Sequence, residues 1–278
     1  MNLFQRDAPA IAAVASSERV STQEDDSEVR LIVLDFGATH FPFLEGQSVG
    51  VVPPGTRDDG RPRAMRLYSV ASARDGEWPG TNTVALFVRR VAFSGAGGTP
   101  AGGQTSNWLC DRRPGDRIEV LGPFGDTFLL PDDPATEILM IGTGTGRAPF
   151  RGFAQRRLRT APHGPGNLHI FFGARTPQVF PAIEQLIADP ALLPSREVAY
   201  SQAQATAKEH VQDRMRRRAT ELEVVLRHKR LHVYVCGSLG LESTVDATLD
   251  EIARARGVDW PALRQQLLDS GRYHAETY

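Results

Sequence analysis

Residues 137–151 read EILMIGTGTGRAPFR, and this stretch decides the fold of the second half of the chain. It begins with a continuous apolar run that ends in glycines, which is typical of a strand buried on both faces of a parallel sheet. Pro149 then favours a helix, because proline suits the first helical turn. The backbone amides and the dipole of such a helix start can bind a pyrophosphate. Arg147 replaces the third glycine of the Rossmann fingerprint GxGxxG, so the stretch predicts a nucleotide-binding α/β domain of another kind.

The same alternation of apolar strands and helices continues to about residue 257. Further strands are predicted at residues 167–175, 196–201 and 231–238, and helices at 149–158, 181–189, 207–226 and 241–257. Buried strands that alternate with helices predict a parallel sheet with helices on both faces. Such a sheet binds its ligands at the carboxyl ends of its strands.

The first half has a different texture, with frequent turn residues and short strands. Strands are predicted at residues 30–36, 47–53, 83–91 and 116–124, and residues 10–15 start another. This pattern indicates an antiparallel barrel or sandwich. The glycine-rich residues 94–107 are expected to form a loop, either floppy or close to a ligand. Residues 131–135, PDDPA, are interpreted as a linker between domains at 1–131 and 132–278.

Composition excludes several classes of protein. The chain has 278 residues and a net charge of −1, whereas a nucleic-acid-binding protein needs a concentrated basic surface. Its two cysteines cannot hold an iron–sulfur cluster of the usual four-cysteine kind, and we expect no metal site. No apolar run approaches the ~20 residues that cross a bilayer, so we expect no membrane insertion and a cytoplasmic location.

Five segments, in order along the chain, resemble the plant-type ferredoxin–NADP reductase family. They are RLYS (66–69), GGQTSNWLCD (102–111), GTGTGRAPFR (142–151), VYVCGS (233–238) and GRYHAETY (271–278). The resemblance covers nearly the whole chain from about residue 25. It implies an N-terminal antiparallel β-barrel that binds FAD and a C-terminal parallel-sheet α/β domain that binds NADP(H). Residues 33–55 also resemble the reductase part of the benzoyl-CoA epoxidase system.

The resemblance assigns the flavin to residues of the first half. They are Arg66, Leu67, Tyr68, Ser69, Arg89, Thr105 and Ser106. Tyr68 is expected to stack on the isoalloxazine ring, and Arg66 to pair with the pyrophosphate. Ser69 is expected beside the flavin N5. The hydroxyl groups of Thr105 and Ser106 are expected to donate to the FAD pyrophosphate.

The nicotinamide nucleotide is assigned to the second half. The expected residues are Gly144, Thr145, Gly146, Arg175, Ser201, Lys208, His210 and Gly237. The first three are expected to hold the pyrophosphate, and Ser201 and Lys208 the 2′-phosphate. Gln202 replaces an arginine that the family has at this phosphate, so the preference for NADPH is expected to be softened. An enzyme of the same fold that prefers NADH therefore stays open.

Four residues are expected at the reacting atoms, namely Ser69, Cys236, Glu276 and Tyr278. Cys236 is expected to position the nicotinamide by packing, without a covalent intermediate. Glu276 matches the family's acidic residue near the flavin and the nicotinamide, which implies that it relays protons or stabilises the semiquinone. Tyr278, the last residue, is expected to cover the flavin and to move aside as a gate.

These assignments imply an FAD-dependent oxidoreductase that transfers electrons between NADPH and a one-electron carrier, ferredoxin or flavodoxin. One alternative is the dedicated reductase of an oxygenase or epoxidase system, and another is a flavin-binding sensor without useful turnover. Arginines at residues 156–159 and 214–218 could dock an acidic ferredoxin. A solvated helix face explains them equally well.

Overall fold

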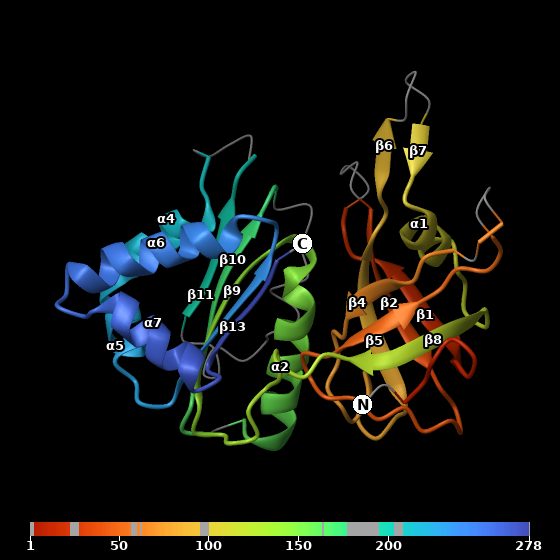
Figure 1. Cartoon of the computed structure of the whole chain (residues 1–278), viewed down its shortest axis with the longest axis horizontal. Coiled ribbons are helices and arrows are strands. Elements are labelled where there is room, and N and C mark those ends of the chain that lie inside the picture. The colour runs from red at the N-terminus through yellow and green to blue at the C-terminus, as the bar shows by residue number, and fades with distance from the viewer. Residues whose placement is uncertain are drawn as a thin grey trace.

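The computed structural model describes residues 3–22, 28–56, 60–61, 63–94, 100–162, 164–176, 195–202 and 208–277. The helix predicted at residues 181–189 and the predicted gate Tyr278 lie outside these ranges. Two large sheets carry most of the described chain, and a third sheet has only two strands. One large sheet is antiparallel and belongs to the first half, and the other is parallel and belongs to the second half (Figure 1).

The first half forms a six-stranded antiparallel sheet in the order β4-β3-β8-β1-β2-β5. Its strands are β1 (Ala10–Arg19), β2 (Val29–Asp35), β3 (Ser48–Val51), β4 (Arg66–Ser69), β5 (Thr83–Arg89) and β8 (Arg117–Phe124). Alternate side chains, such as Ile118 and Val120 of β8, point into one apolar core. A bridge between Val70 and Leu86 joins the edge strand β4 to β5, so the sheet closes on itself. The predicted antiparallel barrel is confirmed.

Part of the glycine-rich stretch that we expected to be a loop is regular. β6 (Ala92–Ser94) pairs with β7 (Pro100–Gly102), and α1 (Gln104–Cys110) begins after Gly103. The helix forms because Leu109 and Cys110 bury their side chains in the barrel core, which stabilises a segment that its glycines alone would leave irregular. Thr105 and Ser106 therefore lie in a helical first turn instead of a loop.

The second half forms a five-stranded sheet in the order β11-β10-β9-β12-β13, and every pair in it is parallel. Its strands are β9 (Glu137–Thr143), β10 (Leu168–Ala174), β11 (Ser195–Tyr200), β12 (Leu231–Gly237) and β13 (Tyr273–Thr277). The expected parallel sheet is thus confirmed. β13, an edge strand of this sheet, was not predicted. The sequence of a terminal segment does not show whether it pairs with a neighbouring strand.

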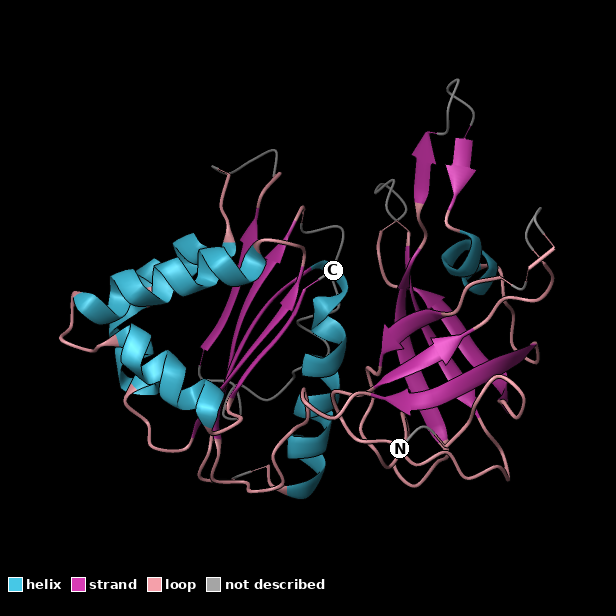
Figure 2. Ribbon diagram, in the orientation of Figure 1, coloured by secondary structure: helices cyan, strands magenta, loops and turns pink. Residues whose placement is uncertain are grey.

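Helices cover both faces of this sheet (Figure 2). They are α2 (Arg147–Thr160), α4 (Val211–Arg217), α5 (Ala219–Leu226), α6 (Leu241–Arg254) and α7 (Trp260–Asp269). On one face, Leu139 and Ile141 of β9 pack among residues of α4 to α7. On the other, Ile138 and Met140 pack with Phe150 of α2. α2 therefore stands between the parallel sheet and the barrel (Figure 1).

The helices depart from prediction in three places. α2 begins at Arg147, two residues earlier than expected. The segment 207–226, expected to hold a helix, holds two, because α4 and α5 are separated at Arg218, whose φ of −100° and ψ of 22° are not helical. No glycine or proline marks that break, and the side chain of Arg218 pairs with Glu221 on the next turn. α7 was not predicted.

Candidate functional site

A pocket of about 630 Å³ opens at the carboxyl ends of the parallel strands. It brings together six of the predicted residues, namely Arg89, Gly144, Thr145, Arg175, Ser201 and His210. Arg89 comes from the end of β5 in the barrel, whereas the others follow strands of the parallel sheet or precede α4. A pocket of this size suits a nucleotide. The pocket therefore receives residues from both halves of the chain.

The GTGTG turn packs tightly on the end of β12. A Cβ atom on Gly146 would lie 2.1 Å from the carbonyl oxygen of Cys236, and one on Gly237 would lie 2.2 Å from Oγ1 of Thr143. Gly144 has a φ of +60°, a left-handed conformation that favours glycine. These glycines bring the 3-10 turn η1 (Gly144–Gly146) and the start of α2 against the sheet edge.

Two polar residues that we did not predict hold this turn. The backbone amide of Ser238 donates to Oγ1 of Thr143 at 3.1 Å, and the two hydroxyl groups lie 3.4 Å apart. Both residues line the pocket. Each lies within a quoted motif, at or just after the end of a strand, and that position could have identified them. They join the turn after β9 to the turn after β12.

Arg147, for which the sequence offered no role, is buried at the boundary of the two halves. Its guanidinium carbon lies 3.9 Å from the ring centroid of Phe87 on β5. Burial, and secondarily the charge of Arg151, lower the pKa of Arg147. The side chain thus packs against the barrel instead of pointing into the pocket.

The predicted flavin strand β4 offers an apolar surface with a cation. Leu67 is 55% exposed, and Arg66 beside it is also exposed. Tyr68 is half-buried against the barrel core, and burial raises its pKa, so the phenol stays neutral. An exposed apolar edge with an aromatic and a guanidinium fits a flat ring joined to a pyrophosphate. These residues and Ser69 do not line the pocket.

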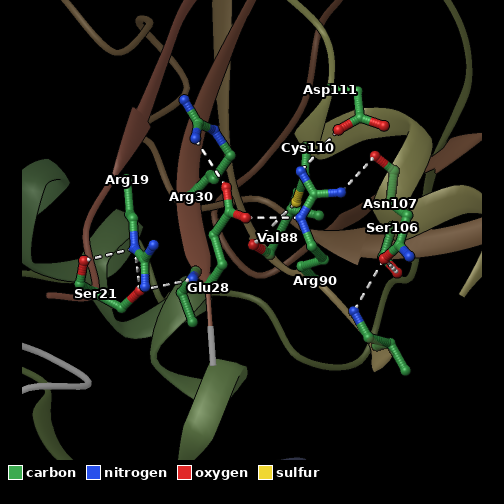
Figure 3. Close-up of polar contacts among 12 residues, drawn as sticks. Arg19, Ser21, Glu28, Arg30, Val88, Arg90, Ser106, Asn107, Cys110 and Asp111 are labelled. Carbon is green, nitrogen blue, oxygen red and sulfur yellow. Dashed lines mark hydrogen bonds and ion pairs between the residues drawn. The ribbon is translucent and has the colours of Figure 1, made fainter. Parts of the chain in front are cut away.

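Helix α1 is fixed to the barrel by Arg90, a residue that we did not predict (Figure 3). Nε of Arg90 lies 2.7 Å from Oε2 of Glu28, and Nη2 lies 2.8 Å from Oδ1 of Asp111, just after α1. Nη1 donates to the carbonyl of Asn107 at 3.4 Å. Burial raises the pKa of Glu28, but hydrogen bonds from Arg30 and Arg90 outweigh it and lower that pKa. Arg90 thus holds the helix that carries Thr105 and Ser106.

Cys236 and Glu276 lie side by side at the carboxyl edge of the sheet. They are partners in the parallel register of β12 and β13. Cys236 is fully buried, and burial together with the charge of Glu276 raises the pKa of its thiol to about 12. A protonated buried thiol is a poor nucleophile, in keeping with a packing role. Burial also raises the pKa of Glu276, which is half-buried.

Some predicted residues do not meet in the pocket. Lys208 is exposed and does not line it, although its neighbours Glu209 and His210 do. Thr105 is buried and Ser106 half-buried, both on the barrel. Two sets of residues therefore result, one on the barrel and one at the edge of the parallel sheet.

Comparison with known proteins gives consistent matches. Residues 140–247 match the family model described as the oxidoreductase NAD-binding domain. The chain is 35% identical over 291 residues to the cyanelle ferredoxin–NADP reductase of Cyanophora paradoxa, and the match covers 100% of this chain and 79% of that protein. It is 31% identical to the chloroplastic ferredoxin–NADP reductase of Spinacia oleracea, with 100% and 78% covered.

Solved structures share the fold. The ferredoxin–NADP⁺ reductase of Plasmodium falciparum, in the structure with 2′P-AMP, superposes with a TM-score of 0.77 over 100% of this chain and 99% of that chain. The sequences are 19% identical, so this likeness speaks for the fold alone.

Proposed function

The chain belongs to the ferredoxin–NADP reductase family, and from that premise we propose that it transfers electrons between NADPH and ferredoxin with bound FAD. The observation that carries the proposal is the pocket at the carboxyl edge of the parallel sheet, where residues of both halves meet. The two halves form two domains, residues 1–131 for FAD and residues 132–278 for NADP(H).

The nicotinamide nucleotide binds along the pocket. The amides of Gly144, Thr145 and Gly146 hold its pyrophosphate at the start of α2. Arg175 and Ser201, which line the pocket at the ends of β10 and β11, hold the 2′-phosphate. His210 and Lys208 flank that end. Gly237 lets the turn after β12 approach closely, as its contact with Thr143 requires.

FAD binds on the barrel. Tyr68 and the exposed Leu67 contact the flat ring, and Arg66 pairs with the pyrophosphate. The hydroxyl groups of Thr105 and Ser106 also face the pyrophosphate, and Arg90 keeps their helix in place. Held by these residues, FAD would supply the chemistry that couples two-electron hydride transfer from the nicotinamide to one-electron transfer.

The remaining residues orient the reactants and move a proton. Ser69, at the end of β4, would orient the reacting edge of a bound flavin. Cys236 would position the nicotinamide by packing, as a neutral thiol, and Glu276 beside it would exchange a proton with solvent.

None of the described helices combines the length and the apolar composition that a membrane crossing requires. A cytoplasmic location is part of the proposal. Both cysteines are free thiols, as a reducing compartment would keep them.

The test is anaerobic titration of the purified yellow protein with NADPH and then with NADH, followed by visible absorption. We expect the flavin bands to bleach at a far lower concentration of NADPH than of NADH. Equal bleaching by NADH would overturn the NADP assignment and keep the reaction. A colourless protein that cannot be reconstituted with FAD would overturn the function itself. The rates at which the protein turns over with ferredoxin and with an oxygenase component as electron acceptors then identify the acceptor.

A further inference from the structure

Helix α2 is fastened to the barrel along one stripe of its surface. Arg151, Gln155 and Arg159 are four residues apart, so their side chains lie on one face of the helix. All three contact residues 71–77 of the barrel, the segment that follows strand β4. The stripe is therefore an interface between the two proposed domains.

Arg151 and Glu77 form the centre of this interface. Nη1 and Nη2 of Arg151 each lie 2.6 Å from a different carboxylate oxygen of Glu77. Nη1 also donates to the carbonyl of Ala71 at 2.8 Å. The two side chains are only 7% and 11% exposed. A forked, largely buried pair of this kind fixes orientation as well as distance.

The ends of the stripe are also bonded. The amide of Ala73 donates to Oε1 of Gln155 at 3.1 Å. Nη1 of Arg159 lies 2.9 Å from Oδ1 of Asp75 and donates to the carbonyl of Gly76 at 2.7 Å. These bonds hold backbone atoms of the barrel segment, so the segment cannot rotate about the central pair.

Gly152 allows the helix to come this close. A Cβ atom at this position would lie 2.8 Å from the carbonyl oxygen of Ser72. Ser72 is itself tied to the barrel, because its hydroxyl accepts the amide of Ala85 at 3.0 Å. Any larger residue in place of Gly152 would push α2 away from the barrel.

Both partners of the interface continue directly into cofactor segments. Residues 71–77 begin two residues after Ser69, the last residue of the proposed flavin strand. α2 begins at Arg147, immediately after the η1 turn that is proposed to hold the nicotinamide nucleotide. The stripe is thus a short covalent and hydrogen-bonded path between the two cofactor segments.

We propose that the Arg151–Glu77 pair is a positioning clamp that sets the GTGTG turn relative to strand β4, and so governs how fast the nicotinamide reduces the flavin. The proposal rests on the function given above. A misplacement of 1 Å between reacting groups can cost about 100-fold in rate. The residues proposed to hold 2′-phospho-AMP, Arg175 and Ser201, follow strands of the parallel sheet, and those proposed to hold FAD belong to the barrel. Loosening the clamp therefore leaves these two affinities in place.

The test uses the FAD-loaded protein with Glu77→Gln and Arg151→Lys, each of which weakens the fork while keeping a polar side chain. We expect the limiting rate of flavin reduction in stopped flow to fall by about 10-fold or more. The Kd for 2′-phospho-AMP should change less than about twofold. Hydrogen exchange at residues 71–77 should accelerate. Arg156→Lys, on the same helix outside the stripe, is the matched control and should alter none of these.

A double variant checks that the two residues act together. If they form one clamp, Glu77→Gln combined with Arg151→Lys should slow reduction little more than either change alone. If Glu77→Gln fails to fold, Gln155→Met removes the acceptor for Ala73 and should slow reduction by a smaller factor.

The outcomes separate the clamp from the proposed function. Two results would overturn the clamp alone, given a wild type that NADPH reduces. The variants could be reduced as fast as the wild type, or their binding of 2′-phospho-AMP could weaken by the same factor as their rate of reduction. A wild type that binds 2′-phospho-AMP but is not reduced by NADPH overturns the proposed function and the positioning role with it.

Discussion

Cys236 and Glu276 occupy paired positions in the parallel register of β12 and β13, so their side chains leave the sheet on the same face. The pair one step earlier, Tyr234 and His274, shows the same relationship, with rings stacked 4.4 Å apart. This face carries the apolar cluster that includes Phe150 of α2. The carboxyl of Glu276 therefore lies at the edge of an apolar layer, which accounts for its raised pKa.

Replacing Glu276 by glutamine should stabilise the cofactor-free protein at pH 8 and change its stability little at pH 4. Because the folded pKa is raised, the native state holds the neutral carboxyl more strongly than the unfolded chain does. The free energy of unfolding therefore falls as the pH rises above the ordinary pKa of a glutamate and through the raised pKa of the folded state. Glutamine is neutral over this whole range and avoids that loss of stability. Urea unfolding at both pH values measures the effect, and an equal gain at both would point to packing instead.

The course of the parallel sheet was predictable because its strands are buried on both faces. Leu139 and Met140 point to opposite faces and are both fully buried, so β9 appears in the sequence as an unbroken apolar run. Helix α1 and the break at Arg218 were not predictable in this way. Helix α1 depends on contacts with residues far along the chain. The break at Arg218 is a backbone conformation that no glycine or proline indicates in the sequence.

The site shows a similar division. Residues in the GTGTG motif could be located from the sequence, because a turn of this kind is built locally. Arg89 was assigned to the flavin by resemblance and Arg90 was given no role, because the groups that these residues meet come from distant parts of the chain. Arg89 lines the pocket, and Arg90 holds α1. The Arg151–Glu77 pair joins residues 74 positions apart and has no local signal.

Gly146→Ala should abolish binding of the nicotinamide nucleotide and destabilise the protein. A methyl group there meets the backbone carbonyl of Cys236, which cannot move without shifting β12. Overpacking of this kind costs about 1–3 kcal/mol. Calorimetric titration with NADP⁺ and thermal unfolding measure the two effects. Thr145→Ser, at the position before Gly146 in the same turn, is the control and should leave the stability of the protein unchanged. Unimpaired binding by Gly146→Ala would contradict the tight turn.

Arg90→Met should loosen α1 and weaken the retention of FAD. The change removes the ion pairs to Glu28 and Asp111 and the hydrogen bond to Asn107 together. Losing hydrogen bonds of a charged group costs about 1.5–3 kcal/mol, which corresponds to a loss in FAD affinity of about 10-fold or more. Flavin fluorescence released on dilution measures it.

Arg30→Met provides the matched control for that change. Arg30 also pairs with Glu28, at 2.9 Å, but its other hydrogen bonds go to Ser17 on β1 instead of to α1. We expect this variant to retain FAD nearly as well as the wild type. Equal loss of FAD from both variants would show that FAD retention depends on the ion pairs of Glu28, and not on the bonds that join Arg90 to α1.

Arg175→Met should weaken the binding of 2′-phospho-AMP more than Lys208→Met does. The sequence pointed to Lys208 as the cation for the 2′-phosphate, but the structure places Arg175 and Ser201 in the pocket wall and leaves Lys208 outside it. Removing a charged donor to a phosphate costs about 1.5–3 kcal/mol, reduced by solvent because Arg175 is exposed, so we expect a loss of about 10-fold. Binding of 5′-AMP, which lacks the 2′-phosphate, should hardly change. Calorimetry at low and high salt measures all of these affinities, and the difference between the two variants should shrink as salt screens the charge. A larger loss from Lys208→Met would place the 2′-phosphate beyond the wall of the pocket, on the side where Lys208 lies.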